Sequence, residues 1–263
     1  MIRLSILLNQ PGALPMELSL ASLCAHLLPL GCVALASLLQ SLTGFGLAIV
    51  LAPFLMFFYD AKDAVSLVLL ICFTGNFVQG ATHFRTADRK LVGLLYAGVL
   101  IGLPLGTWIF FTVSSETLKF WINAMVLVSV LITGFAHTRF RETNANAIRT
   151  GILSGITSAT TGMSGPPILL YLAHTKIAPE ILRASCFVFF FLCNVSTLVS
   201  HTLGGMSVTY VLTEYLYLLP GLALGILLGD ALFPYLPKTW IRKFINLLLP
   251  ITSIIGMAEV LLK

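Results

Sequence analysis

The chain alternates long apolar blocks with short polar links. The apolar blocks cover residues 18–42, 47–58, 64–82, 91–113 and 118–136, and then 148–160, 166–174, 184–203, 210–235 and 240–262. Most are long enough for a membrane-spanning helix, which needs about 20 apolar residues. They lack the alternation of apolar and polar positions that barrel strands require. The pattern predicts an all-α integral membrane protein with ten segments, forming one transport domain over residues 1–263.

Composition supports a membrane protein and argues against a nucleic-acid-binding one. Hydrophobic residues make up 58% of the 263 positions and charged residues 10%, whereas soluble domains carry about 25% charged residues. The 15 Lys and Arg are scattered over the polar links, which is typical of topology signals. The five Cys fall inside apolar blocks without metal-type spacing. We therefore expect a bilayer as partner, no nucleic acid, no metal and no cofactor.

The two halves of the chain repeat one pattern. A shift of 118 positions places Thr43-Gly44 over Thr161-Gly162, Phe73 over Phe191, Asn76 over Asn194 and His83 over His201. Rare polar residues and glycines that keep one register are hard to obtain by chance in an apolar chain. The sequence therefore predicts two repeats of five segments, over approximately residues 18–136 and 148–262.

The distribution of Lys and Arg predicts that the repeats are inverted. If all ten segments reverse direction in turn, eleven of these residues lie on one side of the membrane and four on the other. Such a bias marks the cytoplasmic side, and it places both termini outside, in what we expect is a bacterial inner membrane. The segments at 47–58 and 166–174 are too short to cross about 30 Å. They fit re-entrant half-helices, although tilted crossings stay open.

Each repeat contains a helix break inside an apolar stretch. The first break reads QSLTGFG at residues 40–46, and the second reads SATTGMSGPP at residues 158–167. Irregular backbone at membrane depth is tolerated where it is buried in protein or lines a wet cavity. A half-helix that starts there directs its free N–H groups and positive dipole end at the midplane, which favours an anion. Close helix packing by small residues is the alternative explanation.

At these breaks the sequence resembles the sulfite/anion exporter family TauE/SafE, also called the toluene sulfonate uptake permease (TSUP) family. The resemblance rests on residues 40–46, on residues 161–167 and on the duplicated layout. It implies a secondary transporter, not an enzyme, that moves sulfite, a sulfonate such as sulfoacetate, or a related organic anion. Protons are the candidate coupling ion. The oligomeric state stays open, a dimer included.

The resemblance also implies which residues line the substrate pocket. They are Thr43, Gly44, Gly46, Thr161, Gly162, Ser164 and Gly165, with Gln40 and Ser41 as the next candidates. The first break lacks the Gly-Pro-Pro end of the second, so we expect the two breaks to contribute unequally.

Other polar residues inside the apolar blocks are further candidates. Asn76 and Asn194 form a symmetry-matched pair of amides that could donate to an anion or bond between helices. His83 and His201 occupy equivalent segment ends, where a His could couple transport to protons or simply lie at the interface. Asp230 is a weak coupling candidate, since intramembrane carboxylates are often functional.

Two other function classes compete with a transporter. Residues 162–165 match the GxSG pattern of rhomboid intramembrane proteases, with Ser164 as nucleophile and His201 as base. That hypothesis does not explain why the break is duplicated. An anion channel could use the same breaks as a filter, but inverted hairpins suit alternating access better.

Overall fold

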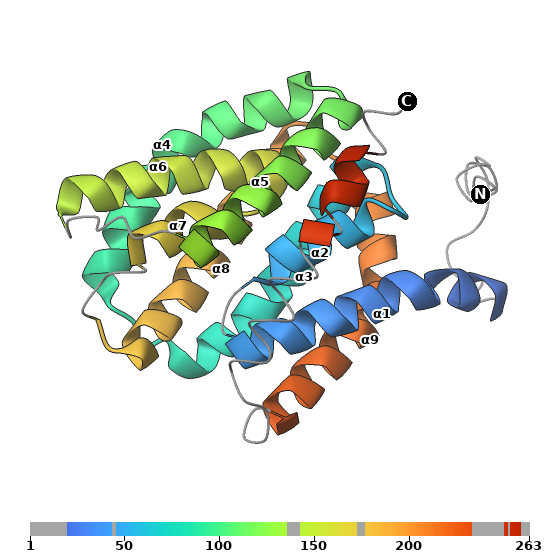
Figure 1. Cartoon of the computed structure of the whole chain (residues 1–263), viewed down its shortest axis with the longest axis horizontal. Helices are drawn as coiled ribbons and strands as arrows, with labels where there is room; N and C mark the ends of the chain where they lie inside the picture. The colour runs from blue at the N-terminus through green and yellow to red at the C-terminus, as the bar shows by residue number, and fades with distance from the viewer. Residues whose placement is uncertain are drawn as a thin grey trace.

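The structure is a computed structural model, and it describes residues 20–43, 46–135, 143–172, 177–232, 250–251 and 253–258. The helices in these ranges are α1 (Leu20–Thr43), α2 (Leu47–Leu55), α3 (Ala61–His83), α4 (Arg89–Thr112), α5 (Ser115–Phe135), α6 (Asn144–Thr161), α7 (Gly165–Leu172), α8 (Pro179–Leu203) and α9 (Val208–Leu232) (Figure 1). The described part of the chain has no strand. The all-α prediction is confirmed there.

Within the described residues, four helices are long and apolar enough to cross a membrane. They are Ala61–Ala81, Arg89–Thr112, Glu180–Leu203 and Val208–Leu232. Large apolar side chains such as Trp108 on α4 and Leu227 on α9 are exposed, as expected of surfaces that contact lipid. The chain is therefore a multi-pass membrane protein. The predicted segment at 240–262 lies mostly outside the described residues.

Both sequence breaks coincide with the end of one helix and the start of a short one. α1 ends at Thr43, and α2 begins after Gly46, whose φ of 102° is left-handed. α6 ends before Gly162, whose φ is 73°, and α7 begins at Gly165. Glycine adopts such φ values without steric cost. α2 and α7 have nine and eight residues, so each extends only about 12–14 Å.

Two helix pairs form the sides of the molecule. In Figure 1, α4 and α6 lie along each other, and α1 lies against α9. In each pair, glycines spaced four apart contact backbone carbonyls of the partner: Gly98, Gly102 and Gly106 meet Ile148, Ile152 and Ile156, and Gly221, Gly225 and Gly229 meet Leu30, Ala34 and Leu38. Residue numbers rise together across both contacts, so the helices of each pair run parallel. Small residues at such spacing permit close helix approach in lipid.

The central contact joins α3 and α8. The Phe73 and Phe191 rings stack with centroids 5.3 Å apart, and Gly80 lies against Phe187. Residue numbers run in opposite directions along this contact, so α3 and α8 are antiparallel. Between them and the outer helices lies the larger apolar core, in which Leu51 and Leu67 are fully buried.

Asp88 caps the start of α4 and links it to a neighbouring helix. Its carboxylate accepts hydrogen bonds from the N–H groups of Lys90 and Leu91. Its own N–H donates to Ser185 Oγ on α8, over 2.9 Å. The link between α3 and α4 is thereby held against the first turns of α8.

Asp88→Ala should lower the free energy of unfolding by about 1 kcal/mol, because two N–H groups at the start of α4 lose their acceptor. The Asp88→Asn variant keeps an acceptor and should lose less than half as much. Thermal unfolding in mild detergent compares the two variants with wild type. Equal losses for Ala and Asn would contradict the capping role.

Candidate functional site

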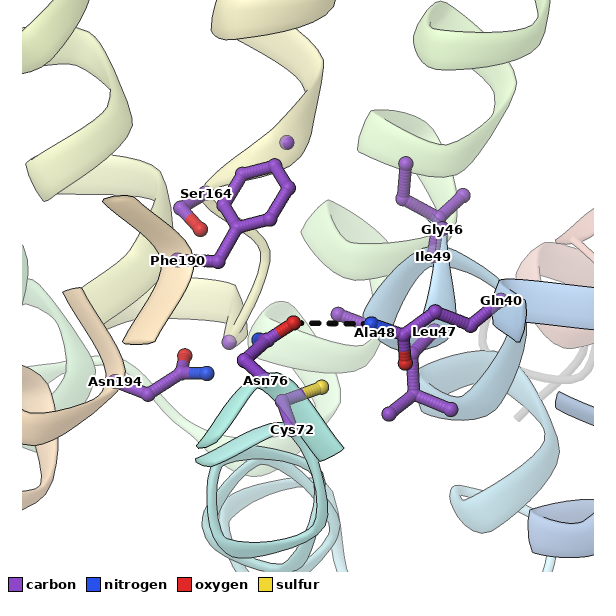
Figure 2. Close-up of a pocket in the computed structure, with 12 residues that line it drawn as sticks. Gln40, Gly46, Leu47, Ala48, Ile49, Cys72, Asn76, Ser164, Phe190 and Asn194 are labelled. Carbon is purple, nitrogen blue, oxygen red and sulfur yellow. Dashed lines mark hydrogen bonds between the residues drawn. The ribbon is translucent and has the colours of Figure 1, made fainter. Parts of the chain in front are cut away.

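The two helix breaks and the middles of α3 and α8 enclose one pocket (Figure 2). It holds about 350 Å³ of space not filled by protein atoms, including the part that opens outward. Its lining consists of Gln40, Gly46, Leu47, Ala48, Ile49, Cys72, Asn76, Gly162, Ser164, Gly165, Phe190 and Asn194. Segments far apart in the sequence, one from each break and one from each central helix, therefore meet at this point.

The start of α2 presents free backbone donors to the pocket. The first N–H bonded within this helix is that of Val50, which donates to the carbonyl of Gly46 over 3.0 Å. The N–H groups of Leu47, Ala48 and Ile49 precede it, and no side chain caps this end. All three residues line the pocket. The positive end of the helix dipole adds to these donors, which together favour a negatively charged ligand.

The start of α7 offers fewer donors than the start of α2. Pro166 and Pro167 occupy its first turn and have no N–H. Gly165 contributes the remaining first-turn N–H, and Ser164 lines the pocket with a side chain that hydrogen-bonds with Cys193. The two breaks thus provide different donor sets, with backbone amides dominant at α2.

Two asparagine side chains complete the polar part of the pocket. Gln40 Nε2 donates to Asn76 Oδ1 over 2.9 Å, and this bond turns the amide nitrogen of Asn76 away from Gln40. Asn194 is 2% exposed, and its Nδ2 has no hydrogen-bond partner among the described residues. Figure 2 shows that this nitrogen points toward Asn76 across the pocket. A buried amide donor without a partner costs about 1–3 kcal/mol, so its retention favours an outside acceptor.

Cys72 and Phe190 form the apolar wall and were not predicted from the sequence. Each lies four residues before one of the asparagines, Cys72 on α3 and Phe190 on α8. Residues four apart lie on one helix face, so the asparagine positions could have identified both. Leu47, Ala48 and Ile49 were also missed, because their contribution comes from the backbone.

The positively charged side chain of Arg183 contacts the first break. Arg183 falls in a polar link of the sequence, but its Nη2 donates to the carbonyl of Ser41 in the last turn of α1, over 3.3 Å. Its guanidinium also lies over the ring of Phe187. Among the described residues that line the pocket itself, none is charged. A cation at the carbonyl end of α1 offsets the negative end of that helix.

The remaining predicted pocket residues lie elsewhere or outside the described part. Ser41 is fully buried and faces Gly229 of α9. Thr161 is buried, and its Oγ1 donates to the carbonyl of Thr157 over 2.7 Å. Neither lines the pocket. The side chain of Thr43 and all of Gly44 are outside the described residues.

Two of the three coupling candidates, His201 and Asp230, do not line the pocket. His201 is fully buried, its Nε2 lies 2.8 Å from the carbonyl oxygen of Ala159, and its ring stacks on Phe110 at 4.1 Å. It is therefore not at an exposed interface. Asp230 is exposed near the end of α9, and the side chain of His83 lies outside the described residues.

Comparisons with known proteins give one match. A family model described as "Sulfite exporter TauE/SafE" matches residues 29–256, which include both breaks and both asparagines. Searches of curated proteins and of solved structures found no match. Within the described ranges, no group of three or more His, Cys, Asp and Glu could hold a metal ion.

Proposed function

This chain belongs to the sulfite exporter TauE/SafE family, and on that premise we propose that it is a secondary transporter for a small oxyanion of sulfur or a sulfonate. Sulfite and organic sulfonates such as sulfoacetate are the substrate class. The transporter acts in a lipid bilayer, and the proposed location is the inner membrane of a bacterium. Proton coupling is part of the proposal.

The hydrogen-bond donors that line the pocket are the main support for this proposal. The uncapped amides of Leu47 to Ile49 and the unpartnered Nδ2 of Asn194 converge on one cavity. These groups only donate hydrogen bonds, so they complement the oxygens of an anion rather than a cation. Hydrogen bonds to a charged acceptor are stronger than neutral ones. A site without a fixed positive side chain binds an anion reversibly, as a carrier requires.

The arrangement of the helices supports inverted repeats, and with them alternating access. The matched residues Phe73 and Phe191 stack on each other, as residues next to a two-fold axis would. Their helices are equivalent by the 118-residue shift and run antiparallel, which is the relation expected of inverted copies. The pair α4 and α6 likewise corresponds to the pair α9 and α1. Transporters with inverted repeats place their substrate where such copies meet.

A channel and a protease are less well supported. In a protease, His201 would bond Ser164, whereas its Nε2 lies against the carbonyl of Ala159 and Ser164 interacts with Cys193. A channel could use the same breaks as a filter, but the inverted arrangement of the two helix breaks suits alternating access better. The two breaks therefore fit a gated binding site better than either alternative.

Purified protein in liposomes should take up labelled sulfite or sulfoacetate with a rate that saturates at high concentration. A carrier has one site per transport cycle, so its rate reaches a plateau. Liposomes without protein give the background, and an imposed pH gradient tests for coupling. An electrical current that rises linearly with anion concentration, without a plateau, would establish a channel in place of the proposed carrier.

A further inference from the structure

A second cluster of buried polar residues lies away from the pocket. Glu214 on α9 is the acceptor at its centre: His26 Nε2 on α1 is 2.9 Å from Glu214 Oε2, and the hydroxyl of Tyr59 donates to the same oxygen over 2.9 Å. The side chains of His26 and Glu214 are 11% and 7% exposed. The ring of His26 also stacks on Tyr217 at 4.5 Å.

The groups that surround Glu214 come from every element packed against it. α1 contributes His26, and the connection between α2 and α3 contributes Tyr59. Asp60 and Asp63, at the start of α3, and Tyr210, on α9 itself, interact electrostatically in the same region. The nearby basic residue Lys62 is directed elsewhere, since its Nζ donates to the carbonyl of Phe111. Tyr215 faces α3, where its hydroxyl contacts Thr74.

We propose that Glu214, together with His26 and Tyr59, is the proton-binding site of this transporter and couples proton movement to the anion. The proposal rests on the proposed transport function. It assigns the coupling role to a cluster different from His83, His201 and Asp230.

The chemistry of the cluster suits reversible binding of a proton. Burial and the neighbouring carboxylate of Glu214 raise the pKa of the Tyr59 phenol above its usual value, so Tyr59 keeps its proton and acts as a donor. A proton that binds the Glu214 carboxylate converts it to a carboxylic acid, which accepts hydrogen bonds more weakly. Protonation therefore loosens the bond to Tyr59, and deprotonation restores it.

Both partners of this hydrogen bond are connected to the pocket. Tyr59 lies four residues after the end of α2, and its N–H donates to the carbonyl of Leu55, the last residue of that helix. The other end of α2 supplies the pocket amides. On α9, Leu222 is eight residues beyond Glu214, about 12 Å along the helix, and its side chain lies beside Gly75, which also neighbours Gln40. A change at Glu214 therefore acts on α2 at one end and on the pocket wall at the other.

The decisive test is Glu214→Gln, which keeps the shape of the side chain but removes the titrating proton. In wild-type liposomes, a gradient of one pH unit should drive about tenfold accumulation of sulfite or sulfoacetate for each coupled proton. The variant should show no accumulation, yet it should exchange internal for external anion at equal pH. A variant with a merely structural defect would lose this exchange as well. Retained exchange therefore shows that only the coupling to protons is lost.

Two further variants and a direct titration complete the test. Tyr59→Phe should reduce accumulation partially, and Tyr210→Phe, on the same helix, should leave it unchanged. Infrared difference spectra of the purified protein should show, on acidification, a carboxyl C=O component that is missing from the corresponding spectrum of Glu214→Gln. This measurement needs no substrate.

The outcomes separate the cluster from the transport proposal. Full pH-driven accumulation by Glu214→Gln would overturn the proposed proton-binding role of Glu214. The same role would be overturned if His201→Gln lost pH-driven accumulation while Glu214→Gln kept it. A wild-type protein that exchanges no anion would overturn the transport function instead. The infrared titration then decides alone whether Glu214 takes up a proton.

Discussion

Asn194→Leu is expected to lose anion binding while the protein remains at least as stable as wild type. The Nδ2 of Asn194 has no protein partner among the described residues, so replacing it leaves no protein group unbonded. The bound anion, in contrast, loses a charge-assisted hydrogen bond worth about 1.5–3 kcal/mol. The dissociation constant should therefore rise about 10- to 100-fold, and calorimetric titration with sulfite or sulfoacetate measures it.

A matched control is Asn123→Leu on α5. Asn123 is also buried, at 1% exposure, but its Nδ2 donates to the carbonyl of Lys119, and it does not line the pocket. This variant should lose stability and keep its affinity for the anion, the opposite of Asn194→Leu. Wild-type affinity in Asn194→Leu would show that the pocket does not bind the substrate through this amide.

Gly102→Ala is expected to cause a large loss of folded protein. A methyl group at Gly102 would collide with the carbonyl oxygen and backbone of Ile152 on α6. Backbone atoms of packed helices cannot rotate away as a side chain can, so α4 and α6 would have to separate along their contact. We expect a loss of about 3 kcal/mol, at the upper end of typical overpacking. Unfolding curves in mild detergent, together with the yield of monodisperse protein, measure it.

Gly93→Ala is the control on the same helix. No atom lies within 4 Å of a methyl group added at Gly93, and alanine favours a helix over glycine by up to about 1 kcal/mol. This variant should therefore be as stable as wild type or slightly more stable. Equal unfolding curves for the two alanine variants would show that α4 and α6 are not closely packed in the membrane.

Much of the local structure was predictable because it depends on neighbouring residues. Apolar runs indicated the helices, and glycines inside those runs indicated the breaks before α2 and α7. The 118-residue register paired Asn76 with Asn194, and both line this pocket. Seven of the predicted pocket residues meet there: Gln40, Gly46, Asn76, Gly162, Ser164, Gly165 and Asn194.

Ser41 and Thr161 were predicted to line the pocket but are not among its lining residues. Both belong to the motifs at the breaks, yet each side chain points out of the pocket, Ser41 toward α9 and Thr161 back to the helix carbonyl of Thr157. A motif defines where the chain breaks, but the rotation of the preceding helix decides which side chains face inward. That rotation is set by packing against helices distant in sequence, α9 for α1 and α4 for α6.

By itself, the sequence determined that this chain is a helical membrane protein with a repeated, broken segment, because hydropathy and glycine positions act locally. The tertiary structure decided the rest. Glu214 and His26 are 188 positions apart, and no period or motif connects them. The glycines at 93 and 102 lie on one helix and differ only in what packs against them. Such contacts arise when helices distant in sequence approach each other, so only the folded arrangement specifies them.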